Sequence, residues 1–270
     1  MLRRDRILLT GASGYFGRHV FAELRSAGLD VVTAGRRGQD LALDLTQVDS
    51  IRQAMVVARP NVVVHLAALS TMAACESDPT LAQRINADCV PELAESVERF
   101  WFVSTDLVFN GRAAPYRTKD PVSPLSAYAR TKVFGEMHAL ALGGGVIRLP
   151  LLFGPSHDGK HGATDMIRHA ITAGRSLDLF DDEFRTPLHV VDAARAVVGL
   201  CRDARGGLAH VAGPERVSRH ELGLRFARAH ELPSDGLRRA PSSDPLRPRD
   251  VSLVGDVPLS RDLDAMLRDS

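Results

Sequence analysis

Tyr128 and Lys132 are the residues whose types and spacing point most directly to chemistry. They stand four residues apart in a stretch rich in alanine and leucine, residues 126–142, which predicts a helix with both side chains on one face. Reducing a ketone by hydride transfer needs a proton donor at the developing alkoxide, and a free tyrosine, with a pKa of about 10, holds its proton firmly. A neighbouring ammonium would lower that pKa. The pair therefore indicates proton transfer to a carbonyl, although this spacing also arises often by chance.

A run of polar residues, Ser104-Thr105-Asp106, follows an apolar run at 100–103 that predicts a strand. Hydroxyls at the carboxyl end of a parallel strand lie where open α/β sheets bind ligands. Thr105 could therefore hold a substrate oxygen in line with Tyr128. Arg185 and the acidic residues 181–183 bring charge to the expected cleft rim, although the acidic residues could equally be ordinary surface.

Gly11, Gly14 and Gly17 lie between an apolar run at 7–9 and an amphipathic stretch beginning near Val20. The pattern predicts a strand, a tight turn and a helix. The first glycine permits the turn, the second lets the backbone approach a pyrophosphate, and the third allows the helix to pack on the strand. The helix N-terminus would then offer N–H groups and a positive dipole end to phosphates. A glycine-rich turn without a ligand is the alternative, and dinucleotide binding is favoured.

The second predicted strand, residues 30–34, ends at Arg36 and Arg37. At this place an NAD-specific site of this kind carries an acidic residue that holds the ribose hydroxyls, whereas guanidinium groups suit a 2′-phosphate. NADP(H) is therefore favoured over NAD, with two solvated surface arginines as the alternative. Farther on, Asp44-Leu45 could contact the adenine amino group, or Asp44 could simply belong to the start of the helix predicted at 48–57.

Further strands are predicted at 62–68, which ends in the small pair Ala67-Ala68, and at 146–150. Ala67 and Ala68 would let a flat cofactor pass close, while His65 inside this run is expected to be a core residue. Helices are predicted at 79–97, 166–173, 190–201 and 221–229, the last capped by Ser218, with a short strand at 208–211. Residues 233–250, rich in proline, serine and arginine, are expected to loop across the surface.

Bulk composition excludes several classes of protein. The charges of the 34 basic and 33 acidic residues nearly cancel, so the composition does not indicate a basic surface for binding nucleic acid or a membrane. Three widely spaced cysteines argue against a disulfide framework or zinc site, and no metal is expected, although His157, Asp158 and His161 share one loop. The first strand begins within a few residues of Met1 and no apolar run could span a bilayer, so the cytoplasm is the expected compartment.

Taken in order, these motifs resemble the extended short-chain dehydrogenase/reductase superfamily, and within it the dTDP-4-dehydrorhamnose reductase branch. The resemblance is carried by Thr10-Gly11-x-x-Gly14-x-x-Gly17, His65-Leu66-Ala67-Ala68, Ser104-Thr105-Asp106-x-Val108-Phe109-x-Gly111, Tyr128-x-x-x-Lys132, Arg185-Thr186-Pro187-Leu188-x-Val190-x-Asp192 and Arg247-Pro248-x-Asp250-Val251-Ser252-Leu253. It implies an α/β fold, a Rossmann-type doubly wound parallel sheet with a smaller discontinuous C-terminal substrate lobe. Residues 1–150 and about 188–212 would form the NAD(P)-binding domain, and residues 151–187 and 213–270 the substrate lobe.

The resemblance also implies roles for individual residues. Thr105 would orient the carbonyl, Tyr128 would donate the proton, and Lys132 would hold the nicotinamide ribose. Thr105, Asp106 and Arg185 are the expected substrate contacts. The expected cofactor contacts, besides Tyr128 and Lys132, are Gly11, Ser13, Gly14, Tyr15, Phe16, Gly17, Arg36, Arg37, Asp44, Leu45, Ala67 and Ala68. Many relatives pair through helices of the main domain, so a homodimer is one expected assembly.

The implied activity is NADP(H)-dependent reduction of a keto group, most simply the C4 keto group of a nucleotide-linked 6-deoxysugar. Three positions depart from the branch: Leu107 replaces a usual Tyr, Asn110 a usual Asp, and Leu151 a usual Trp. In the family, the Tyr and Trp that Leu107 and Leu151 replace help to line the sugar pocket, so a different deoxysugar or another carbonyl compound is an alternative substrate. A nucleotide-sugar epimerase or dehydratase, or a non-catalytic cofactor-binding regulatory subunit, would also fit these motifs.

Overall fold

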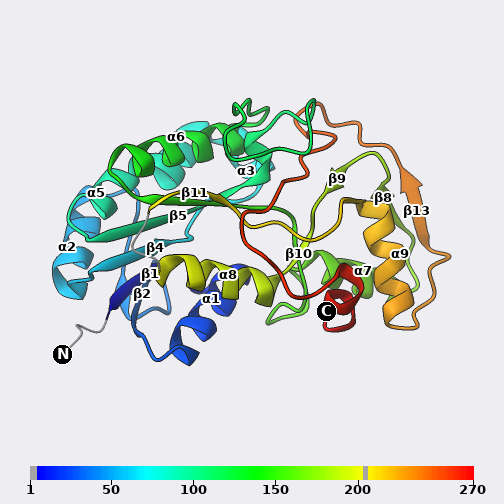
Figure 1. Cartoon of the computed structure of the whole chain (residues 1–270), viewed down its shortest axis with the longest axis horizontal. Helices are drawn as coiled ribbons and strands as arrows, with labels where there is room; N and C mark the ends of the chain where they lie inside the picture. Colours follow the sequence, from blue (N-terminus) through cyan, green and yellow to red (C-terminus); the bar gives the residue numbers. More distant parts are fainter. Residues whose placement is uncertain (1–4, 203–205) are drawn as a thin grey trace.

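A seven-stranded parallel sheet forms the centre of the molecule (Figure 1). The computed structural model describes residues 5–202 and 206–270. The strand order is β11-β6-β5-β4-β1-β2-β3, which is the doubly wound arrangement expected from the sequence. The strands are β1 (Arg6–Thr10), β2 (Asp30–Gly35), β3 (Leu41–Ala42), β4 (Val62–His65), β5 (Arg99–Thr105), β6 (Gly145–Leu149) and β11 (Gly207–His210). The predicted fold class is therefore confirmed.

Helices cover both faces of this sheet because its strands are apolar on both sides. Within β1, Ile7 and Leu9 pack with α1 (Tyr15–Ser26) and α8 (Val190–Arg202), whereas Leu8 packs on the opposite side. That opposite side is covered by α2 (Val48–Ala58), α5 (Val90–Ala94) and α6 (Ala127–Ala141). The carboxyl ends of the strands therefore open at one edge between two helical layers. None of the helices in the described ranges is both long and apolar enough to cross a membrane.

The remaining elements form a smaller part beside the sheet (Figure 1). They are β7 (Leu152–Phe153), α7 (Ala163–Thr172), β8 (Leu177–Phe180), β9 (Phe184–Arg185), β12 (Val217–Ser218), α9 (Arg219–Ala229), β13 (Leu237–Ala240) and α10 (Leu263–Arg268). Strand β10 (Leu188–His189), which leads directly into α8, pairs with β7. Two chain segments, one before β10 and one after β11, build this part. The pairing of β12 with β9 and of β13 with β8 joins them. The expectation of loops throughout 233–250 is therefore wrong at 237–240, where the chain adds a parallel partner to β8.

The predicted helix at 79–97 is interrupted. The structure has α3 (Met72–Ser77), α4 (Pro79–Gln83), a π-helical turn (Arg84–Asp88) and α5. Asn86 lies in that turn, where its amide bonds both backbone groups of Leu69 and the hydroxyl of Thr131. These contacts hold the segment after β4 against α6, and the extra residue of the π-turn aims Asn86 inward. The strand predicted at 62–68 likewise ends at His65, since the Ala67 N–H bonds the Thr10 hydroxyl instead.

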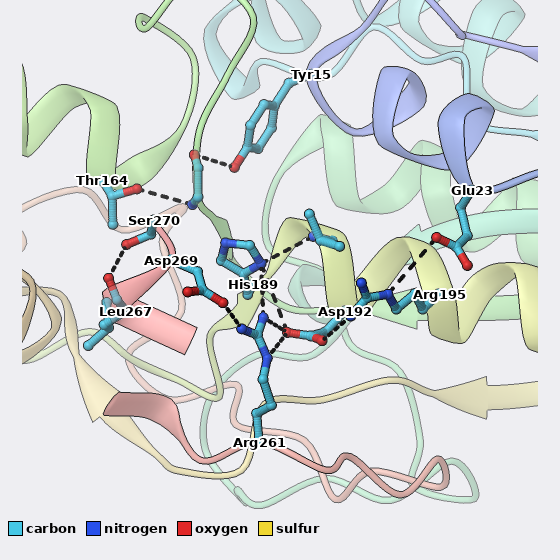
Figure 2. Close-up of polar contacts among 12 residues, drawn as sticks. Tyr15, Glu23, Thr164, His189, Asp192, Arg195, Arg261, Leu267, Asp269 and Ser270 are labelled. Carbon is cyan, nitrogen blue, oxygen red and sulfur yellow. Dashed lines mark hydrogen bonds and ion pairs between the residues drawn. The ribbon is translucent and has the colours of Figure 1, made fainter. Parts of the chain in front are cut away.

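The C-terminal segment is held against α8 by Arg261. Its guanidinium donates to the carboxylates of Asp192 and Asp269 and lies 3.3 Å from Nδ1 of His189 (Figure 2). Asp192 lies in the first turn of α8 and is nearly buried, so this arginine joins the last helix to the layer of helices that covers the sheet. On the same side, the Tyr15 hydroxyl donates to the Gly154 carbonyl, and this bond links α1 to the loop before α7.

Candidate active site

A cavity of about 370 Å³ lies at the carboxyl end of β5. Its walls are Ser70, Met72, Thr105, Asp106, Leu107, Tyr128, Pro150, Leu151, Leu152, Glu183, Arg185, Arg219 and Arg247. Four residues that the sequence assigned to catalysis or substrate binding, Thr105, Asp106, Tyr128 and Arg185, therefore face one space. This is the edge of a doubly wound sheet at which ligands bind.

Thr105 and Asp106 occupy the turn at which β5 ends. The Thr105 hydroxyl accepts the Leu107 N–H and donates to Oδ1 of Asp106 at 3.2 Å, which fixes its orientation. Asp106 is buried, and burial raises the pKa of its carboxyl to about 6, although the Arg185 guanidinium, 3.5 Å from Oδ2, and the Thr105 bond act against the rise. The carboxyl is therefore close to titration at neutral pH.

Tyr128 is presented by the first turn of α6, which two capping groups fix. The Ser126 hydroxyl accepts from the Ala129 N–H, and the Glu76 carboxylate accepts from the Ala127 N–H. Burial raises the pKa of the Tyr128 hydroxyl above its usual value, and the Asp106 charge adds to the rise. In the chain alone, burial and Asp106 therefore decide the direction of this shift, and the lowering of the Tyr128 pKa by Lys132 stays a prediction.

Lys132 follows Tyr128 by one turn but is not part of the cavity wall. Its ammonium is buried and lies 3.9 Å from the centre of the Phe102 ring. Burial lowers the pKa of Lys132 to about 8, while the charge of Glu136 opposes this change. The lysine therefore lies beneath the cavity, against β5.

The glycine turn has the geometry that its spacing predicted. Gly11 has φ +76°, and a Cβ there would lie 2.7 Å from the Ala67 nitrogen. A Cβ at Gly17 would lie 2.0 Å from the Gly11 oxygen, so packing alone demands glycine at both positions. Gly14 is different: a Cβ would meet only the Gly11 oxygen, at 3.3 Å. Packing inside the protein therefore does not require glycine at position 14, and the exposed backbone there leaves room for a ligand to approach closely.

The other expected cofactor contacts surround this turn. Ser13 is exposed, Phe16 packs on the core, and Tyr15 points toward Gly154. Ala67 and Ala68 are partly buried just beyond β4, and His65 is a core residue bonded to Thr10, as expected.

Arg36 and Arg37 are exposed at the end of β2. Asp44 is engaged locally, because its Oδ1 accepts from both the N–H and the hydroxyl of Thr46, and these bonds lower its pKa. Leu45 is partly buried and packs against the apolar layer that includes α2.

This arrangement can be compared with known proteins. The model of the RmlD substrate binding domain matches residues 5–251. The chain belongs to this family. The predicted resemblance to the dTDP-4-dehydrorhamnose reductase branch of the extended short-chain dehydrogenase/reductases is therefore confirmed.

The chain is similar to two kinds of protein whose names describe different functions, a reductase and a subunit of another enzyme. A dTDP-4-keto-6-deoxy-D-glucose reductase from Streptomyces niveus is 31% identical over 272 residues, covering 94% of this chain and 90% of the relative. The methionine adenosyltransferase 2 subunit beta of Pongo abelii is 32% identical over 266 residues, covering 92% and 80%. Sequence similarity alone therefore links the chain to both an enzyme and a subunit of another enzyme.

Solved structures agree on the fold of the family. A dTDP-4-dehydrorhamnose reductase from Clostridium acetobutylicum is 25% identical, with a TM-score of 0.84 over 97% of this chain and 96% of that one. A dTDP-4-dehydrorhamnose reductase from Bacillus anthracis, solved in complex with NADP, is 19% identical and has a TM-score of 0.89 over 99% and 98%.

Several wall residues of this RmlD-family cavity were not assigned from the sequence. Glu183 is buried here, so the surface alternative for the acidic residues is wrong at this position. Arg247 belongs to the motif Arg247-Pro248-x-Asp250, from which no role for it was predicted. Arg219 directly follows the helix cap Ser218, and nothing in the surrounding sequence indicated that it lines a cavity. Leu107 and Leu151, two of the three departures from the branch, both line the cavity.

The histidine-containing loop is held by a hydrogen bond between Nδ1 of His161 and Oδ1 of Asp158, at 2.8 Å. Across residues 5–202 and 206–270, no group of three or more His, Cys, Asp or Glu side chains could hold a metal ion.

Proposed function

We propose that the chain is an NADP(H)-dependent reductase of a keto group, namely the C4 keto group of a nucleotide-linked 6-deoxysugar. The observation that carries this proposal is that Thr105 and Tyr128 face one cavity at the carboxyl edge of a doubly wound sheet. The glycine turn begins at the carboxyl end of β1 on that sheet. Similarity to a Streptomyces niveus dTDP-4-keto-6-deoxy-D-glucose reductase supports the substrate class.

The cofactor proposal rests on the fit of the turn and of the residues after β2. Gly14 leaves backbone accessible to a pyrophosphate at the start of α1, where N–H groups and the helix dipole favour anions. Arg36 and Arg37 are exposed where a 2′-phosphate would need a positive partner. The bound cofactor would supply the hydride that reduces the carbonyl carbon.

The chain's own residues would handle the substrate oxygen and its proton. The Thr105 hydroxyl, fixed by Leu107 and Asp106, can bond the carbonyl oxygen and orient it. Tyr128 would give its proton to the alkoxide as the alcohol forms. A raised pKa keeps this hydroxyl protonated before reaction, and a positive charge brought near it would favour the phenolate afterwards. Lys132, one turn away, is the residue proposed for that task.

The division of the chain is proposed on the same grounds. Strand β11 pairs with β6, and α8 packs on α1, which supports grouping about 188–212 with residues 1–150 in a cofactor domain. Segments 151–187 and 213–270 join each other through β8 with β13 and β9 with β12. They supply Arg185, Arg219 and Arg247 to the cavity, as a substrate lobe should.

NADPH oxidation with a panel of nucleotide 4-keto-6-deoxysugars tests the function. We expect turnover that prefers NADPH over NADH and falls by at least about 100-fold in Tyr128→Phe, because general acid catalysis contributes about 10²–10⁴-fold. Tight NADPH binding without turnover would contradict the reductase. It would favour a cofactor-binding regulatory subunit, which similarity to the methionine adenosyltransferase subunit makes the second candidate.

A further inference from the structure

The ammonium of Lys132 lies against the face of an aromatic ring. Its nitrogen is 3.9 Å from the centre of the Phe102 ring, and both residues are buried. A ring face attracts a cation through its quadrupole, and this attraction grows when water is excluded. A carboxylate in the same place would neutralise the ammonium, whereas a ring stabilises the charge and leaves it available to a ligand. Phe102 therefore favours a charged lysine at this position.

The contact depends on a close approach of α6 to β5, which Gly135 permits. A Cβ at Gly135 would lie 2.4 Å from Cζ of Phe102 and 2.6 Å from the carbonyl oxygen of Asn86. The same ring stacks on the imidazole of His65 in β4, with 5.8 Å between the ring centres and 23° between the planes. Because neighbours on α6 and β4 both fix the ring, its position beneath the ammonium is set by close packing.

The titratable groups that face Lys132 come from three elements. Burial lowers the pKa of Lys132 to about 8, and the carboxylate of Glu136, one turn farther along α6, opposes this change. Glu136 is itself paired with Arg148 at 2.6 Å, which offsets its negative charge. Burial raises the pKa of Cys89, at the start of α5, to about 12 and lowers that of His65, in β4, to about 3, so both are neutral at pH 7. The ring beneath the ammonium therefore has a large share in keeping it charged.

We propose that Phe102 is a positioning residue, whose ring holds the charged ammonium of Lys132 one helical turn from Tyr128. The inference rests on the proposed function in that Lys132 is taken to serve the cofactor ribose and the phenolate of Tyr128. It adds the residue that keeps this lysine charged and in place. A lysine that lost its proton would bring no positive charge to the phenolate. Phe102 acts through Lys132, since it lies in β5 beneath the wall of the cavity.

NMR of the full chain tests the contact without any turnover. The lysines of the chain are Lys119, Lys132 and Lys160, so ¹³C-lysine labelling gives few signals to follow as pH changes. Lys119 and Lys160 are exposed and serve as internal references. Calorimetric titration with NADPH at pH 8 and pH 6 then measures whether the charge of Lys132 matters to the cofactor.

The variants remove one buried ring at a time. Phe102→Leu keeps an apolar side chain and loses the ring face, and Phe102→Met, whose flexible side chain fills irregular gaps, does the same if the leucine variant does not fold. Phe100→Leu is the matched control. Phe100 is a buried residue on the same face of β5 and stacks on the same His65, with 6.2 Å between ring centres and 27° between planes. Thermal melting establishes that each variant is folded.

We expect Lys132 to titrate near pH 8 in wild type and about one unit lower in Phe102→Leu, because a desolvated cation–π contact favours the charged form. At pH 8 the charged fraction would then fall from about a half to about a tenth, so NADPH binding should weaken about fivefold. At pH 6 both proteins keep a charged lysine, and the difference should nearly vanish. Phe100→Leu should match wild type at both pH values.

The inference is overturned if Lys132 titrates in Phe102→Leu as it does in wild type, or if Phe100→Leu lowers its pKa equally. It is also overturned if the loss of NADPH affinity in Phe102→Leu is the same at pH 6 as at pH 8, since a structural defect alone would act at both. A Lys132 pKa and an NADPH affinity that depend on Phe102, in a chain that reduces no keto sugar, would support the inference and refute the reductase alone.

Discussion

Gly14 and Gly17 should respond in opposite ways to the same substitution. A Cβ at Gly17 would lie 2.0 Å from the Gly11 oxygen and 2.9 Å from Cα of Ala12, so α1 and the turn would have to separate. Overpacking costs about 1–3 kcal/mol, and an obstacle made of backbone places Gly17→Ala near the upper value. For a chain of this size, ~3 kcal/mol corresponds to a melting temperature lower by about 6–12 °C.

Gly14→Ala should leave the fold intact. Gly14 has φ −72° and ψ 168°, values that alanine adopts freely, and its Cβ would approach only the Gly11 oxygen, at 3.3 Å. We therefore expect a stability change within about 1 kcal/mol. The added methyl group would, however, project where a pyrophosphate must approach the backbone. NADPH binding should weaken by at least about tenfold.

Two measurements separate these effects: thermal melting by circular dichroism, and NADPH titration followed by nicotinamide fluorescence. Gly199→Ala is the matched control, because Gly199 is exposed within α8 and a Cβ there would meet nothing within 4 Å. It should stabilise slightly, by up to about 1 kcal/mol. A Gly17→Ala variant that melts with wild type, or a Gly14→Ala variant that binds NADPH normally, would refute the reasoning.

Two further substitutions probe buried charges. Glu136→Gln should lower the free energy of unfolding in urea by about 3–5 kcal/mol, because it leaves Arg148, now 2.6 Å from Glu136 and like it only 4% exposed, as an unpaired buried charge. Glu92→Gln, at the more exposed pair with Arg52, is the control and should cost under about 1 kcal/mol. Equal losses in the two variants would contradict this reasoning. The pKa of Asp106 is raised from 3.8 to about 6, so the folded chain binds the carboxyl proton more tightly than the unfolded chain does. This tighter proton binding favours the folded state at low pH, and the benefit is lost as pH rises from about 4 to 6. Asp106→Asn should therefore gain up to about 3 kcal/mol over wild type at pH 8 and little at pH 4; an equal difference at both pH values would argue against a raised pKa.

The sheet could be predicted because its strands are continuous apolar runs with helical patterns between them, as in 62–65 and 145–149. Tyr128 and Thr105 could be found because spacing on one helix and position after one strand are local properties. The π-turn at Asn86 was not predictable, since it depends on bonds to Leu69 and Thr131, which lie 17 and 45 residues away in sequence.

The wall of the cavity was predictable only in part for the same physical reason. Glu183 and Arg219 come from different segments, and only the pairing of β9 with β12 brings them together. Lys132 shows a second limit. Its spacing from Tyr128 was correctly interpreted as one helix face, but tertiary burial against Phe102, not helical periodicity, decides where its ammonium lies.

The sheet is completed by a strand that is synthesised late. Strand β6 is buried at every residue, from Gly145 to Leu149, and its outer neighbour β11 comes from residues 207–210, after the first half of the smaller part. A nascent chain or fragment that ends near residue 150 would therefore expose β6 as an apolar edge strand, the kind of surface that promotes aggregation. The proposed cofactor domain should therefore not be separable by cutting the chain there, and an exchange of the proposed substrate lobe between relatives should keep residues 188–212 with the sheet.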